Sequence, residues 1–200
     1  MRPADPVNVE DHKTTPENDK DDLTMPLHLT EPLHNLLQPL FKALPLEQAM
    51  DHLVVTADQP ASQHVPLVED IVSNEVIADR PELVAGLWLY IDELDRSHTA
   101  SQQVDTPTGS FWHAIMHRRE GDFSNSKYWF RRTGKHPVMS RITTAGGSAG
   151  AGTTIGEYEP FSFVDRVQRA YDKGDNVDWP ELVAMQRREW RALFEWCVEH

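Results

Sequence analysis

The stretch of residues 106–137 carries start and stop signals for two consecutive helices, and these signals constrain the fold more than any other feature. Thr106-Pro107 supplies a capping hydroxyl followed by a first-turn proline, and Gly121-Asp122 combines a left-handed helix end with a new cap. Gly134 and Pro137 then end the second helix. Two well-delimited helices in the middle of the chain favour a helical fold.

The rest of the chain shows the same helical spacing of apolar residues, and no alternating strand pattern occurs in it. We therefore predict an all-α fold of six to eight helices. The helices expected outside the central stretch cover residues 33–44, 46–55, 67–77, 81–103 and 163–174 and the segment after residue 178.

Composition limits the chain to one domain and a tail. Residues 1–25 contain seven acids, three bases and three prolines but almost no large apolar side chains, which predicts a disordered acidic tail. Residues 26–200 are expected to form a single helical domain. Within it, residues 140–156 hold five of the ten glycines and are expected to form a flexible loop. The single cysteine, Cys197, excludes an intrachain disulfide and a cysteine-based zinc site.

The charge of the chain is unevenly distributed. The formal net charge of −13 argues against binding nucleic acid or an anionic membrane, yet residues 112–141 carry seven bases against two acids. This basic island offers a place for a small anionic ligand, unless its arginines pair with acids of neighbouring helices. Because the sequence contains neither a long apolar run nor a secretory signal, we expect a cytoplasmic protein.

A polar stripe is expected where two helices face each other. Along residues 81–103 the apolar face continues, at 3.6 residues per turn, into Asp95 and His98. The connection to the next helix is short, so the two helices should be antiparallel neighbours, with His98 opposite His113 and Asp95 level with His117. His113, His117 and Glu120 form a stripe of their own at spacings of four and three residues.

The following helix should provide a third side of the same site through Lys127, Tyr128 and Arg131. A histidine near neutral pKa can move a proton, a carboxylate can orient it, and a lysine or arginine can hold an anion. The candidate catalytic residues are thus Asp95, His98, His113 and His117, and the candidate ligand-binding residues are Glu120, Lys127, Tyr128 and Arg131.

Three functions remain open for this stripe. In the first, it binds a small anionic or polar ligand without a metal, with or without turnover, and no cofactor can be named. In the second, the stripe is structural and the protein is a helical protein-protein interaction module. In the third, the histidines and a carboxylate hold a catalytic metal, although Ala114 follows His113 where a zinc peptidase motif has glutamate.

Two resemblances concern the same region. Gly121-Asp122-Phe123 with Ser126, Phe130, Thr133 and Pro137 resembles the second half of a tetratricopeptide unit, which implies a helix but, without repetition elsewhere, no repeat array. The block Trp-His-Ala-Ile-Met-His-Arg-Arg-Glu-Gly-Asp-Phe-Ser-Asn-Ser-Lys-Tyr-Trp-Phe-Arg-Arg is similar to a family of uncharacterised bacterial proteins. That similarity implies no activity, substrate or site residue.

Overall fold

The computed structural model describes residues 26–56, 58–142, 158–174 and 178–200. Throughout these ranges the regular structure is helical, which confirms the all-α prediction. The expected acidic tail and all but the first residues of the expected glycine-rich loop lie outside the described residues. The helices are α2 (Glu31–Ala43), α3 (Val65–Val72), α4 (Pro81–Tyr90), α5 (Leu94–Ser101), α6 (Pro107–Arg119), α7 (Phe123–Thr133), the 3-10 helix η2 (Pro137–Arg141), α8 (Pro160–Lys173) and α9 (Trp179–Glu199).

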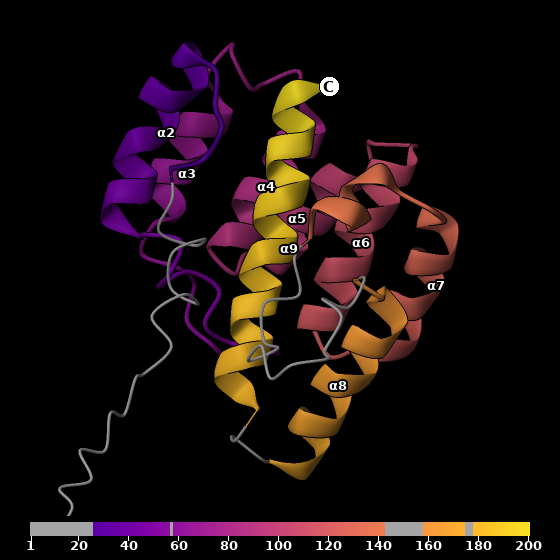
Figure 1. Ribbon diagram of the computed structural model, residues 1–200. Helices are drawn as coiled ribbons and strands as arrows, with labels where there is room; N and C mark the ends of the chain where they lie inside the picture. Colours follow the sequence, from indigo (N-terminus) through magenta and orange to yellow (C-terminus); the bar gives the residue numbers. More distant parts are fainter. Residues whose placement is uncertain (1–25, 57, 143–157, 175–177) are drawn as a thin grey trace, which may run out of the picture.

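The long helix α9 runs through the middle of the molecule, with α2 and α3 on one side and α6 to α8 on the other (Figure 1). It packs closely on α4, because Gly86 has no side chain: an added Cβ would lie 2.8 Å from the ring of Phe194. The indole of Trp190 donates a 2.8 Å hydrogen bond to the carbonyl oxygen of Gly86. A glycine in the interior of a helix is thus explained by the close approach of its neighbour.

Helix α6 is buried on all sides, from Gly109 to Arg119. It begins and ends at the predicted capping residues. Thr106 accepts a hydrogen bond from the amide of Gly109, and Gly121 adopts φ +85°. Asp122 caps α7 in the same way, through the amide of Asn125 at 3.0 Å. The predicted pair of helices over residues 106–137 is confirmed.

The prediction of one continuous helix over residues 81–103 is wrong, because the chain turns a corner between α4 and α5. Asp92 adopts φ +67° at this corner. The buried guanidinium of Arg119 explains the break, because it donates to the carbonyl of Leu89 at 3.0 Å and to the carboxylate of Asp92 at 2.7 Å. Polar groups that would otherwise be unpaired at the corner are therefore satisfied by α6.

Two shorter helices also differ from expectation. Residues 46–50 form turns instead of a helix, and their backbone is fixed by the buried amide of Gln186, which donates to the carbonyls of Met50 and His52 at 2.9 Å each. The helix expected over residues 67–77 is α3, which ends at Val72. None of the helices in the ranges given above is both long enough and apolar enough to cross a membrane.

Candidate functional site

Three histidine rings from two helices converge beside α7. The ring centroid of His98 on α5 lies 5.2 Å from that of His113 and 5.3 Å from that of His117, both on α6. The centroids of His113 and His117 are 6.2 Å apart. The predicted register of α5 and α6 is thereby confirmed, even though α5 is not a continuation of α4.

His113 is the most buried of the three, at 3% exposure. Its Nδ1 lies 3.0 Å from the carbonyl oxygen of Gly109, which can only accept, so the ring hydrogen is on Nδ1 and the lone pair is on Nε2. That Nε2 is buried and has no hydrogen-bond partner among the described residues. Burial lowers the pKa of His113, and so do His98, His117 and Arg132, which favours the neutral form of the ring.

His117 is fixed from both sides. Its Nδ1 lies 2.6 Å from Oε1 of Glu120, one turn further along, and the carboxylate requires the ring hydrogen on Nδ1. The side-chain nitrogen of Asn125 on α7 lies 3.2 Å from Nε2 and 3.3 Å from Nδ1 of this ring. A carboxylate bound to one ring nitrogen in this way holds the imidazole of His117 in a single tautomer.

His98 forms the solvent-facing side of the cluster and is half-buried. Its Nε2 lies 3.2 Å from the amide nitrogen of Gln102. Burial lowers the pKa of His98 and so does His117, whereas the negative charges of Glu120 and Asp95 act in the opposite direction. Asp95 itself is exposed on the first turn of α5 and acts on the histidine through space.

Trp129 on α7 closes the cluster on one side, a role that was not predicted from the sequence. Its ring stacks on His113 with a centroid distance of 4.1 Å and an interplanar angle of 15°. The guanidinium of Arg132 lies 5.1 Å from the centroid of the same indole. The sequence pattern that could have predicted this role is the spacing of Asn125, Trp129 and Arg132, which places them on one face of α7.

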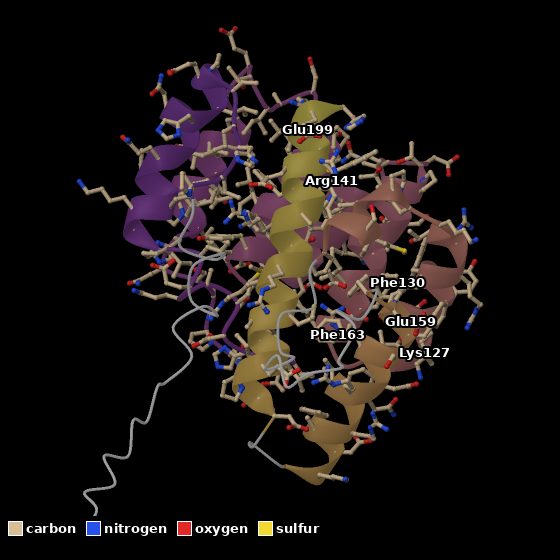
Figure 2. All side chains as sticks on the ribbon, viewed as in Figure 1. Lys127, Phe130, Arg141, Glu159, Phe163 and Glu199 are labelled. Carbon is tan, nitrogen blue, oxygen red and sulfur yellow. The ribbon has the colours of Figure 1, made fainter. Side chains whose placement is uncertain are left out.

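The expected ligand-binding residues of α7 are not brought to the histidines. Lys127, labelled in Figure 2, forms an ion pair with Asp165 on α8. It lines a hollow of about 460 Å³ together with Arg131 and Gln168. Tyr128 is exposed, and its ring makes an edge-to-face contact with that of Trp129. Of the eight expected site residues, five therefore surround the cluster and three lie outside it.

Most of the basic island is paired with acids of other elements, as one of the two sequence interpretations required. Arg118 is completely buried and forms an ion pair with Glu189 of α9, which also accepts from the hydroxyl of Tyr158. The guanidinium of Arg118 stacks on Phe163, labelled in Figure 2. At the surface, Arg141 pairs with Glu199 at 2.7 Å. These cations are consequently not available to hold an anion at the histidines.

Beside the cluster lies an acidic cavity of about 720 Å³. Two of its lining residues are next to the histidines: Glu120, which binds His117, and Asp95, one turn before His98. Among the described residues that line it there is no lysine or arginine. Its carboxylates are those of Asp51, Asp92, Glu93, Asp95 and Glu120.

Among the described residues, two groups of side chains have the composition of a metal site. Ligand atoms of Asp51, His52 and Asp92 lie within 4.8 Å of one another, and so do those of His117, Glu120 and Asp122. Within the described ranges, the set of His98, His113 and His117 does not form such a group. The second group shares two residues with the histidine cluster, but Asp122 is already engaged as the cap of α7.

The comparisons with known proteins add no relative: no protein-family model, no curated protein and no solved structure matches this chain.

Proposed function

We propose that the protein binds a small polar ligand at the histidine cluster, here defined as His98, His113, His117, Glu120 and Asn125. The observation that carries this proposal is the buried and unpaired Nε2 of His113. An acceptor without a partner costs about 1–3 kcal/mol of folding free energy. A ligand that donates a hydrogen bond to Nε2 would recover that cost.

The cluster also has the chemistry for proton transfer. Burial keeps His113 neutral with its lone pair on Nε2, so it can accept a proton from a bound hydroxyl or amine. Glu120 holds His117 in the tautomer whose Nε2 can serve as a second acceptor. We therefore include turnover by general acid-base catalysis in the proposal, with His113 as the base.

The test uses the imidazole nitrogens as reporters. Long-range ¹H–¹⁵N spectra of the wild-type protein are recorded with glycerol, acetate, inorganic phosphate, ethanolamine and zinc chloride, each added separately. We expect at least one non-metal probe to shift the Nε2 resonance of His113, and the His113→Phe variant to lose binding of that probe while it remains folded. The resonances of His136, which lies outside the cluster, serve as the internal control.

Other outcomes would contradict the proposal in different ways. If no probe moves a resonance of the cluster, its histidines are structural, and the alternative of a helical protein-protein interaction module gains support. If zinc alone moves them, the alternative of a metal-dependent enzyme replaces the proposal.

A further inference from the structure

We infer that the ligand of the histidine cluster is an organic cation, such as a primary ammonium compound, that enters through the acidic cavity. This inference rests on the proposed function and specifies the class of ligand. It departs from the anionic ligand that the basic island suggested. The geometry supports it in three independent ways.

The first support is the balance of donors and acceptors. His113 offers a lone pair that no described residue occupies, and its burial makes an unmet acceptor costly. Glu120 and Asp95 add carboxylate oxygens at the edge of the cluster. The donors around the cluster are amides, and the amide of Asn125 is already directed at His117. A site with surplus acceptors selects a ligand that donates several hydrogen bonds, as an ammonium group does.

The second support is the charge of the adjoining cavity. Its described lining contains five carboxylates and no basic side chain except the imidazole of His52. Asp92 is balanced by Arg119 at 2.7 Å and Glu93 by Arg96 at 3.9 Å. Asp51, Asp95 and Glu120 form no ion pair with a lysine or arginine of the described chain, so the cavity has a negative potential that concentrates cations.

The third support is that most of the cations that an anionic ligand would need are engaged elsewhere. Arg118 and Arg119 are both 0% exposed and form ion pairs with Glu189 and Asp92, respectively. Lys127 and Arg131 line a separate hollow next to α8. Arg132 is the arginine that acts on His113, and its guanidinium lies over the indole of Trp129. The carboxylates of Glu120 and Asp95 both act on His98, so a cation is favoured over an anion on that side of the cluster.

The experiment compares three probes of nearly the same size and different charge: butylammonium, butanol and butyrate. Each is titrated into the full-length protein while the imidazole resonances of His98, His113 and His117 are followed. We expect butylammonium to shift them at the lowest concentration. The Glu120→Gln variant should weaken its binding roughly tenfold or more, because a charge-assisted hydrogen bond is lost. Asp95→Asn should weaken it less, since Asp95 acts from the rim.

The matched control is Asp172→Asn, which removes an exposed carboxylate on α8 and should leave the affinity for butylammonium unchanged. If Asp172→Asn weakens binding as much as Glu120→Gln does, the effect is one of net charge and the inference is overturned. A stronger response to butyrate or butanol also overturns it but leaves the proposed function standing. If none of these three probes, and none of the probes used to test the proposed function, shifts an imidazole resonance of the cluster, both the inference and the proposed function are contradicted.

Discussion

Two buried imidazoles, His113 and His136, show how the same side chain can be structural in one place and a candidate site in another. They are exposed to 3% and 6%, respectively. At His136, Nδ1 accepts from the amide of Val138 at 3.2 Å and Nε2 lies 3.1 Å from the hydroxyl of Thr108. At His113 only Nδ1 is bonded. The lesson is that the pairing of the nitrogens, and not the depth of burial, distinguishes the two regions.

The largest expected effect is on stability at the paired histidine. His136→Phe keeps a ring next to Phe111 and Trp196 but leaves the amide of Val138 and the hydroxyl of Thr108 without a partner. At about 1–3 kcal/mol for each unpaired group, we expect the free energy of unfolding to fall by roughly 2–4 kcal/mol in urea denaturation at pH 7. If the free energy of unfolding falls by less than about 1 kcal/mol, the two hydrogen bonds of His136 contribute little to stability, and the comparison with His113 fails.

A pH effect of similar size should come from the same residue. Burial lowers the pKa of His136 to about 4, while the unfolded chain keeps the ordinary value of 6.5. As the pH falls from 6.5 to 4, the unfolded state takes up a proton that the folded state does not, so stability falls; below about 4 the penalty is constant.

This pH-dependent loss amounts to about 3 kcal/mol for His136. His98 and His113 act in the same direction, since their pKa values are also lowered. The contribution of His136 is therefore the difference between the wild type and His136→Phe, measured by urea denaturation at pH 7 and pH 4. Equal pH dependence of the two proteins would show that His136 is protonated in the fold.

The smallest effect on stability is expected at the unpaired histidine. His113→Phe preserves the stack on Trp129 and removes an unsatisfied acceptor, which offsets the lost bond to Gly109 and the cost of a larger ring. We expect the free energy of unfolding to change by less than about 1 kcal/mol, measured as for His136→Phe. A loss as large as that of His136→Phe would mean that His113 is structural.

Sequence reasoning was most successful where signals are local. The caps at Thr106 and Asp122 and the glycine at position 121 depend only on neighbouring residues, and both helices form as predicted. The alignment of His98 with His113 was also correct despite the mistaken long helix. The reason is that the short connection before α6 sets the register of α5 and α6, whereas the corner at Asp92 lies upstream of it.

The failures concern long-range contacts. Periodicity divides α7 into one face with Asn125 and Trp129 and another with Lys127 and Arg131, but it does not say which face meets α6 and which meets α8. The corner after Tyr90 depends on Arg119, which lies almost thirty positions downstream. The acidic cavity is lined by residues from 51–62, from 91–95 and by Glu120, which are far apart in the sequence. No motif in these segments predicts it.

Arg119 affects which segments of the molecule unfold together. Its guanidinium holds the carbonyls of Leu89 and His52 and the carboxylate of Asp92, so one side chain joins three segments of chain that surround the cavity. The loop around His52 and the corner at Asp92 are therefore members of the same cooperative unit as α6. Their amide hydrogens should exchange with solvent together and slowly, at the rate of the core and not at the rates of independent surface loops.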